Sequence, residues 1–200
     1  MLNQVTPGVR LYSDGDQAIA RGGRQGEQMI SQLHGKYYEQ VYRGNVYSLN
    51  TQGTNVSTTA ALATTWTGLG IANPTGSGKN LVLLMFCFTQ FAAGAAGSVG
   101  ILGGTGALTA TLTPQNRLIG AVNSSVARGS ATDTISTPLY IAAYGSIGSV
   151  ATTGYGLVPG IFIDVAGSIV IPPGSFIGSY TGVALTSAAN IQYVWEEVPL

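Results

Sequence analysis

The fold is decided by the stretch Asn73-Pro74-Thr75-Gly76-Ser77-Gly78-Lys79-Asn80, which leads directly into Leu81-Val82-Leu83-Leu84-Met85-Phe86-Cys87-Phe88-Thr89-Gln90-Phe91. The first half is rich in Pro, Gly and Ser, residues that are typical of turns. The second half is the longest apolar run in the chain. Three interpretations compete for this stretch: a phosphate-binding loop, the start of a membrane span, or a turn that enters the central strand of an all-β domain.

A phosphate-binding loop is excluded by the residues around Lys79. The motif requires a Gly five positions before Gly78, where this chain has Asn73, and Ser or Thr after the lysine, where it has Asn80. The loop must also open a helix whose N-terminal amides face the phosphate, whereas residues 81–91 have the composition of a strand. We therefore expect no nucleotide cofactor.

A membrane span is also rejected, although residues 81–104 carry no charge over 24 residues, a length that could cross a bilayer. Thr89-Gln90 and a series of glycines interrupt this run. Only Lys79 flanks it, so the charge bias of membrane proteins is absent. We expect a buried strand, a Gly/Ala loop and a second strand, with no membrane association.

Short strands separated by turns are expected along the rest of the chain. The expected strands cover residues 46–49, 60–71, 81–91, 98–102, 108–113, 118–122, 138–144, 161–165, 168–171, 176–181 and 191–198. Strands at such regular spacing are typical of β-sandwiches and barrels. No helical period of useful length follows residue 50. The sequence therefore predicts an all-β fold, a jelly-roll-like β-sandwich.

The clearest β-hairpin is expected over residues 161–180. Pro172-Pro173-Gly174 must end one strand, because Pro supplies no backbone donor and Gly accepts a positive φ angle. The residues before this turn alternate between two faces, as a strand does. Jelly rolls commonly use a strand, a tight corner and a returning strand of this kind.

Charge divides the chain into two parts. Nine of the sixteen charged residues lie in residues 1–50, whereas residues 51–195 hold only five. We therefore expect an N-terminal arm of residues 1–43 and a β-sandwich domain of residues 44–200.

Most of the arm is expected to be extended, because Pro-Gly, Asp-Gly and Gly-Gly pairs break up its first half. Apolar residues then recur every four positions from Met29 to Val41. This spacing predicts a short helix over about residues 27–42. Gly35 lies inside that window and weakens the helix.

The net charge is zero, with 8 basic and 8 acidic residues in a chain of 200. A neutral chain is poorly suited to bind nucleic acid or an anionic membrane by electrostatic attraction. Near-zero net charge also promotes association between protein molecules. We therefore expect other protein subunits to cover much of the surface.

Residue patterns for catalysis and metal binding are missing from the sequence. His34 is the only histidine, so neither a His-based metal site nor a Ser-His-Asp triad has the partners it needs. Cys87 is the only cysteine and is expected to be a buried apolar residue. Glu196 and Glu197 are adjacent, so on a strand they face opposite sides and cannot act as a carboxylate pair. We expect neither an enzyme nor a protein with a cofactor, a metal or a small-molecule substrate.

Tyrosine and arginine gather where the arm meets the β-domain. These residue types dominate the energetic centres of protein interfaces. The candidate residues for docking on a partner are Arg21, Arg24, His34, Lys36, Tyr37, Tyr38, Tyr42, Arg43 and Tyr47. An alternative is that the tyrosines only cap the open end of the β-domain.

Four segments resemble virion structural proteins of tailed bacteriophages. They are Ser31-Gln32-Leu33-His34-Gly35-Lys36-Tyr37-Tyr38-Glu39-Gln40 with Tyr42-Arg43-Gly44-Asn45, Asn73-Pro74 with Gly76-Ser77-Gly78-Lys79-Asn80-Leu81, Gly167-Ser168-Ile169-Val170-Ile171-Pro172-Pro173-Gly174, and Val194-Trp195-Glu196-Glu197-Val198-Pro199. Within that group the chain is most similar to small head decoration (cement) proteins with jelly-roll domains. The resemblance implies no catalytic residues. It implies a homo-oligomer, a trimer or dimer, that binds the major capsid protein at the capsid surface of the virion.

The expected function is therefore that of a decoration protein that bridges capsid subunits and stabilises the lattice. The alternative is a tail, baseplate or fibre component that recognises a host surface or a glycan. Exposed loops such as residues 94–97, 123–133 or 146–156 would then carry aromatic residues for stacking, and Tyr155 is the only aromatic residue in these three loops. One structural question stays open at residues 81–91. A strand that is apolar on both faces must be covered on both, and the second cover is either the arm or another subunit.

Overall fold

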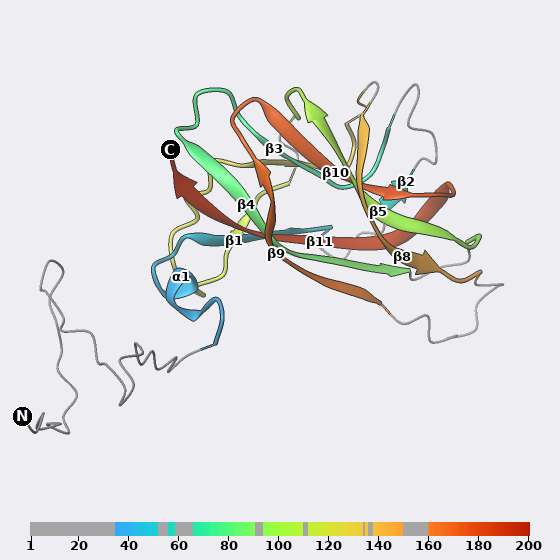
Figure 1. Cartoon of the computed structure of the whole chain (residues 1–200), viewed down its shortest axis with the longest axis horizontal. Helices are drawn as coiled ribbons and strands as arrows, with labels where there is room; N and C mark the ends of the chain where they lie inside the picture. Colours follow the sequence, from blue (N-terminus) through green and yellow to red (C-terminus); the bar gives the residue numbers. More distant parts are fainter. Residues whose placement is uncertain are drawn as a thin grey trace, which may run out of the picture. The chain divides into compact units, whose positions relative to one another are not determined.

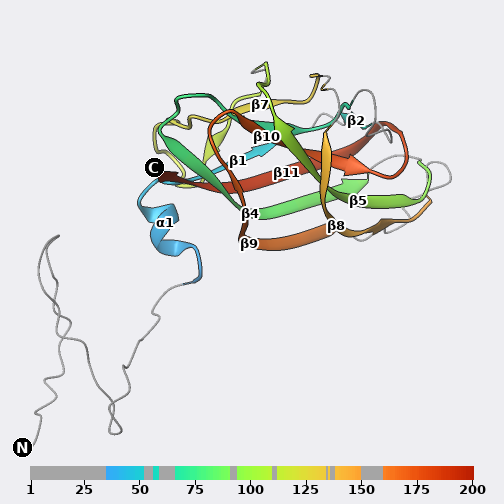
Figure 2. The same ribbon diagram turned by 45° about the horizontal axis from the view of Figure 1, so that its top comes forward.

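The computed structural model describes residues 35–51, 56–58, 66–90, 94–109, 112–133, 135, 138–149 and 160–200. In this part of the chain, two antiparallel sheets lie face to face and there is almost no helix (Figure 1, Figure 2). The core lies between the sheets. The predicted all-β sandwich is confirmed.

The first sheet runs in the order β6 (Gln115–Asn116), β1 (Val46–Asn50), β11 (Leu185–Pro199), β4 (Lys79–Gln90) and β9 (Ile161–Ile171), and β2 (Val56–Thr58) also pairs with β11. The second sheet runs in the order β7 (Arg128–Ser130), β3 (Gly70–Asn73), β10 (Ser175–Thr181), β5 (Gly97–Thr105) and β8 (Leu139–Ile147). The longest strands, β4, β9 and β11, all belong to the first sheet.

The longer strands form nested antiparallel pairs. β5 with β8 is the innermost pair, followed outward by β4 with β9, β3 with β10 and β1 with β11. Successive pairs alternate between the two sheets. The chain is in effect one long hairpin folded over into a sandwich, which is the double Greek-key topology of a jelly roll. The jelly-roll part of the prediction is therefore confirmed.

β4 has a bulge that keeps its apolar residues on the core side. Leu84 has no partner in the ladder with β11, because Leu83 pairs with Trp195 and Met85 pairs with Val194. The bulge lets both Leu83 and Phe86 face the core. The largest fully buried side chains are Trp66, Trp195, Tyr193, Phe86, Phe88, Leu49, Leu69, Ile71, Leu81, Leu83, Ile101 and Leu102. Each contributes about 1.5–3 kcal/mol by its removal from water.

Most of the predicted strands are present. Residues 46–49, 81–91, 98–102, 138–144, 176–181 and 191–198 correspond to β1, β4, β5, β8, β10 and β11. Residues 161–165 and 168–171 form the single strand β9 instead of two strands. Ala166 and Gly167 have φ angles of 54° and 81° and form a bulge opposite β4. This bulge explains why the sequence pattern breaks there.

Some predicted strands are wrong. Residues 118–122 form a turn, and Gly120 within it has a φ of 89°. In residues 108–113, the described part makes only an isolated bridge between Leu112 and Gly129. Of the strand predicted over residues 60–71, Gly70 and Ile71 belong to β3, whereas residues 60–65 lie outside the described residues. The sequence did not predict β2, β6 or β7, because two or three residues are too short to show alternation.

The hairpin predicted over residues 161–180 is also wrong. β9 pairs with β4 in the first sheet, whereas β10 pairs with β3 and β5 in the second. Pro172-Pro173-Gly174 is a tight turn, as expected, and Gly174 has a φ of 81°. It carries the chain across the sandwich from one sheet to the other, because the two strands that flank it pair within different sheets.

The turn over residues 74–78 also crosses between the sheets, since it joins β3 to β4. Gly76 and Gly78 have φ angles of 77° and 70°, which glycine adopts without the strain that a side chain would add. The turn delivers the chain into β4, an interior strand of the first sheet. The third interpretation of the stretch that starts at Asn73 is therefore correct.

The helix of the arm is shorter than predicted. α1 (Tyr38–Tyr42) is five residues long, and residues 35–37 are not helical. Residues 27–34 of the predicted helix lie outside the described residues. The compact unit that contains both sheets begins at Tyr37. α1 therefore belongs to the same unit as the sheets, although the sequence placed it in the arm of residues 1–43.

α1 provides the second cover of β4. Leu84 lies on the outer face of the first sheet, where it packs with Val46 of β1 and Val194 of β11. Tyr37 and Val41 pack against these three residues. Leu84 is only 4% exposed as a result. The segment that precedes β1 thus shields part of the outer face, and the question left open by the sequence is answered at this position.

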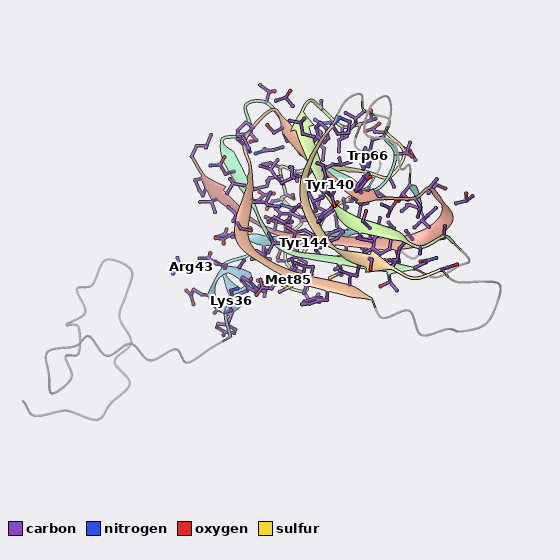
Figure 3. All side chains as sticks on the ribbon, turned by 45° about the vertical axis from the view of Figure 1, so that its right-hand side comes forward. Lys36, Arg43, Trp66, Met85, Tyr140 and Tyr144 are labelled. Atoms are coloured by element: carbon purple, nitrogen blue, oxygen red, sulfur yellow. The ribbon has the colours of Figure 1, made fainter. Side chains whose placement is uncertain are left out.

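The outer face of the second sheet is covered by Trp66. Its ring packs with Leu102 of β5 and Phe176 of β10, and its Nε1 donates a hydrogen bond of 2.6 Å to the carbonyl oxygen of Ser179 (Figure 3). A Cβ atom at Gly178 would lie 2.5 Å from the Trp66 ring. The close approach of the indole to the sheet therefore requires glycine at this position.

Candidate docking surface

α1 is held on the first sheet by one of its flanking residues. The hydroxyl of Tyr37, at the N-terminal end of α1, donates a hydrogen bond of 2.5 Å to Oδ1 of Asp164 on β9. Val41 packs on the apolar group beneath the helix. At the other end, the backbone N of Glu197 donates to the carbonyl oxygen of Asn45. These contacts fix α1 against the sheet, so that its other side faces outward.

The outward side of α1 carries two stacked tyrosines. Tyr38 and Tyr42 are four residues apart, their ring centroids are 6.0 Å apart and their planes differ by 12°. Tyr38 is 45% exposed and Tyr42 is 65% exposed. Nε of Arg43 pairs with Oε1 of Glu39 at 2.9 Å in an exposed ion pair, which adds little stability. The two tyrosine rings and Arg43 are therefore exposed to solvent on the outward side of the helix.

A second group of exposed apolar residues lies at the same end of the sandwich as α1. Nδ2 of Asn116 donates a hydrogen bond to the carbonyl oxygen of Gly44. The backbone N of Arg117 donates a second hydrogen bond to the carbonyl oxygen of Val46. These bonds hold the turn over residues 117–121 beside the segment that follows α1, as the yellow part of Figure 1 shows. Ile119 is 93% exposed.

We define the α1 surface as the exposed side chains of α1 and of the residue that follows it, together with those of residues 118–122. Its members are Tyr38, Tyr42, Arg43, Leu118, Ile119 and Val122. Large aliphatic side chains at such exposure are uncommon in a group on a monomer and mark sites of association. The sequence did not reveal the aliphatic part, because Leu118–Val122 has the composition of a strand. Gly120 in the middle of this run was the one available signal of a turn.

The predicted docking residues fall into four groups. Lys36, Tyr38, Tyr42 and Arg43 are exposed, and Figure 3 shows Arg43 at α1, outside the sheets. Tyr37 is half-buried by its contacts with the first sheet. Tyr47 is 2% exposed, and its hydroxyl lies 3.0 Å from Oγ of Ser124. Arg21, Arg24 and His34 lie outside the described residues.

Tyr47 is therefore a core residue in this structure and does not belong to the docking surface. It lies on β1 with its ring beside that of Trp195, at a centroid distance of 6.3 Å. The alternative prediction, that tyrosines cap the β-domain, describes Tyr37 and Tyr47 better than it describes Tyr38 and Tyr42. Residue type alone does not separate the two roles.

Lys79 has a structural role and does not face a phosphate site. Its Nζ lies 2.8 Å from Oε2 of Glu197, a carboxylate on β11 that is buried. The other oxygen of Glu197 accepts hydrogen bonds from Oγ of Ser125 at 2.6 Å and from the backbone N of Val126 at 2.9 Å. Glu197 therefore fastens the loop that precedes β7 to the first sheet.

The neighbouring carboxylate, Glu196, lies on the opposite face of β11 and is partly buried. Burial raises the pKa of Glu196 above its ordinary value of 4.5. Burial also raises the pKa of the Cys87 thiol, and the positive charge of Arg117 opposes this effect. Because a reactive thiol needs a lowered pKa, these directions give no indication of a nucleophile or an acid–base pair.

No group of three or more His, Cys, Asp or Glu residues in the described part of the chain could hold a metal ion. No helix among those same residues has the length and apolar character needed to cross a membrane. Comparison with known protein families, with curated proteins and with solved structures found no match. The α1 surface is thus the candidate site that the geometry offers.

Proposed function

We propose that this chain is a structural protein of a tailed-bacteriophage virion that decorates the capsid and docks on the major capsid protein through the α1 surface. The observation that carries the proposal is the exposed pair of stacked tyrosines with Arg43 at a helix that is itself fixed to the sandwich, together with the exposed aliphatic residues of the turn that lies at the same end. The resemblance of four sequence segments to phage head decoration proteins supports the choice of partner. The location that follows is the capsid surface.

The mechanism is mechanical rather than catalytic. A rigid jelly roll bound to more than one capsid subunit opposes their separation, because several contacts must break together. Burial of apolar surface supplies about 25 cal/mol per Å² toward attachment. Tyr42 and Arg43 would add the orientation that aromatic and guanidinium groups give to interfaces. The N-terminal arm, which the sequence predicts over residues 1–43, would reach neighbouring subunits.

The test is a binding assay with expanded phage heads that lack the protein. Purified wild-type chain and the variants Tyr42→Ala and Ile119→Ala are titrated onto heads, and bound copies are counted after sedimentation. Loss of a central interface side chain costs about 1.4 kcal/mol or more, so each variant is expected to bind at least about tenfold more weakly. A chain without residues 1–36 separates the contribution of the arm from that of α1.

Tyr140→Ala is the matched control. Tyr140 is 40% exposed, close to the 45% of Tyr38, but it lies on β8 of the second sheet, away from α1. Its replacement is expected to leave head binding unchanged. Binding that is lost equally in the control and in Tyr42→Ala would contradict docking through the α1 surface. A map of intact particles with the protein on the tail instead of the head would overturn the decoration role in favour of the tail or fibre alternative.

A further inference from the structure

One carboxylate links α1 to a break in the sheet beneath it. Oδ1 of Asp164, on β9, accepts the hydrogen bond of 2.5 Å from the hydroxyl of Tyr37 at the N-terminal end of α1. The same oxygen accepts a hydrogen bond of 3.1 Å from the backbone N of Ala166. Ala166 lies in the bulge of β9, where residues 165–168 stand opposite the single residue Leu84 of β4. Asp164 therefore bonds the helix and the bulge at once.

The bulge has a backbone conformation that most residues avoid. Ala166 has a φ of 54°, and it is the one non-glycine residue with a positive φ in the part of the chain that the structure describes. The left-handed region is strained for a residue with a Cβ atom, so a neighbouring contact must hold it there. Asp164 provides such a contact, because its side chain accepts from the backbone N two residues later, as in an Asx turn. The shape of the bulge therefore depends on the direction of the Asp164 carboxylate.

The bulge lies where β4 has the least support from its neighbours. Leu84 has no ladder partner in either of the adjacent strands, β11 and β9. The nearest pairs in the β9 ladder are Leu83 with Ile169 and Met85 with Asp164. The side chains of Leu84 and Met85 belong instead to the apolar group beneath α1, and Figure 3 shows Met85 beside the helix. α1 thus lies over the point at which both ladders of β4 break.

α1 is too short to be a stable helix without contacts to the sheet. Its five residues are far fewer than an isolated helix needs in water. Its N-cap residue, Tyr37, makes no side-chain capping hydrogen bond, and none of the five helical residues is fully buried. The stack of Tyr38 on Tyr42 depends on helical spacing, because the two rings are four residues apart. The presentation of this stack therefore depends on the contacts that hold α1 to the sheet, and the bond to Asp164 is one of them.

We propose that Asp164 is a positioning residue for the α1 surface, and that α1 and the bulge of β9 open and close as one unit. Loss of the carboxylate releases Tyr37 and Ala166 together, so the helix frays and its tyrosines no longer face a partner in one arrangement. By linkage, a partner that binds the closed form also steadies the bulge. The effect on capsid binding rests on the proposed function, whereas the coupling between α1 and the bulge does not.

Amide hydrogen exchange of the full-length chain, measured by NMR spectroscopy, tests the coupling without capsids. The reporters are the backbone N–H groups of Val41 and Arg43, which are hydrogen-bonded in α1, and that of Ala166 in the bulge. Asp164→Ala is expected to speed exchange at all three by at least about fivefold, because each loses protection when the unit opens. Tyr37→Phe removes only the hydroxyl. It is expected to speed exchange at Ala166 by about twofold or more, because the carboxylate loses a bond that fixes its direction.

Two further variants are the controls. The carboxamide oxygen of asparagine can accept both hydrogen bonds, so Asp164→Asn is expected to keep slow exchange in α1. Asp133 also accepts from a backbone N, that of Thr109, in a loop outside α1 and β9, so Asp133→Ala is expected to leave all three reporters unchanged. Amides of β11 in the same spectra show whether the sandwich stays folded. Exchange at Val41 that is equally slow in Asp164→Ala and in wild type would overturn the coupling, and so would a Tyr37→Phe chain in which the bulge exchanges as in wild type.

The same variants, titrated onto expanded phage heads, test the role of Asp164 in docking. Asp164→Ala is expected to bind at least about fivefold more weakly than wild type, and Asp164→Asn nearly as well as wild type. The double variant Tyr37→Phe/Asp164→Ala should bind no more weakly than Asp164→Ala alone, because both changes break the same bond. Faster exchange in α1 with unchanged head binding would overturn the docking role of Asp164. A wild-type chain that binds no heads would overturn the proposed function and that role with it, whereas hydrogen exchange alone decides the coupling.

Discussion

Nδ2 of Asn73 lies 2.9 Å from the carbonyl oxygen of Ile171, and this hydrogen bond joins the two sheets of the sandwich. Asn73 ends β3 in the second sheet and Ile171 ends β9 in the first. The same nitrogen donates to the carbonyl oxygen of Lys79 at 2.7 Å, and the backbone oxygen of Asn73 accepts from the N of Gly174 at 2.8 Å. One fully buried side chain thus fastens both turns that cross between the sheets.

Replacement of Asn73 is expected to loosen both crossings. Asn73→Ala removes two hydrogen bonds of about 1 kcal/mol each and leaves the oxygen of Ile171 without this donor, so the free energy of unfolding should fall by about 2–3 kcal/mol. Asn73→Asp should be worse, because it turns an oxygen toward two carbonyl oxygens. Urea unfolding at neutral pH measures the free energy of unfolding of both variants. Asn80→Ala, in the segment that follows the first crossing, is the control, and an equal loss in the control would contradict the assigned role.

Glu197 is expected to be more important for stability than its partner Lys79. Its side chain is 1% exposed, whereas that of Lys79 is 33% exposed. Glu197→Ala leaves Lys79, Ser125 and the N of Val126 without their acceptor, so we expect a loss of about 3 kcal/mol. Lys79→Met keeps two of the three donors to the carboxylate and should cost about 1 kcal/mol. Urea unfolding measures the free energy of unfolding of both variants. A larger loss of stability in Lys79→Met than in Glu197→Ala would refute the prediction.

Gly178→Ala is expected to displace the Trp66 ring, since the new methyl group would lie 2.5 Å from it. Overpacking of this kind costs about 1–3 kcal/mol. The displaced indole should also become more solvated, so its fluorescence should shift to longer wavelength in the folded protein. Gly148→Ala is the matched control, because no atom lies within 4 Å of a Cβ at that position. Unchanged fluorescence and stability in Gly178→Ala would show that the sheet can move away from Trp66.

Glu196 is expected to destabilise the protein at neutral pH. Its pKa is raised by burial, so folding favours the protonated form. The stabilisation from that proton is fully present below pH 4.5, the ordinary pKa, and is lost as pH rises through the raised value. Glu196→Gln should therefore have a higher Tm than wild type at pH 7, and this difference should shrink toward pH 4. A difference in Tm that is the same at both pH values would argue against burial as the cause.

Two truncated chains separate the contribution of the arm to thermal stability from that of α1, which covers part of the outer face of the first sheet. A chain that begins at residue 37 keeps Tyr37 and Val41 over Leu84, and its Tm should stay close to that of the full chain. A chain that begins at residue 44 uncovers the apolar group on the first sheet. Loss of about 2–3 kcal/mol of burial would lower its Tm by roughly 5–10 °C. Calorimetry of the two proteins decides the matter, and equal Tm values would mean that α1 contributes no cover.

The strands that were predicted well from the sequence are those whose buried residues form an apolar run or an alternation of apolar and polar residues. β4 is apolar over most of its length and is bounded by a turn, so its position could be read directly. β6 and β7 have only two and three residues and owe their pairing to β1 and β3. Leu118–Val122 has the composition of a strand, but no edge in the described sheets pairs with it, and its side chains stay exposed.

The candidate site could be predicted only in part. Tyr42 and Arg43 were found from residue type, because aromatic and guanidinium side chains near a domain boundary favour an interface. Ile119 joins them only because Asn116 holds its turn beside Gly44, a contact across 72 positions of the chain. The bond of Tyr37 to Asp164 was not predicted either, since the two residues lie in elements that are far apart in the chain.

The sequence by itself determined where the chain turns and which segments are extended, because Pro, Gly and apolar alternation act on neighbouring residues. It could not decide what each strand pairs with. Pro172-Pro173-Gly174 has the same local chemistry in a hairpin and in a crossing between sheets, and the pairing of β9 with β4 selected the crossing. Tyr42 and Tyr47 are likewise the same residue type, yet one is exposed and the other buried. Only the packing of distant segments removes one of them from water, and that packing exists in the tertiary structure alone.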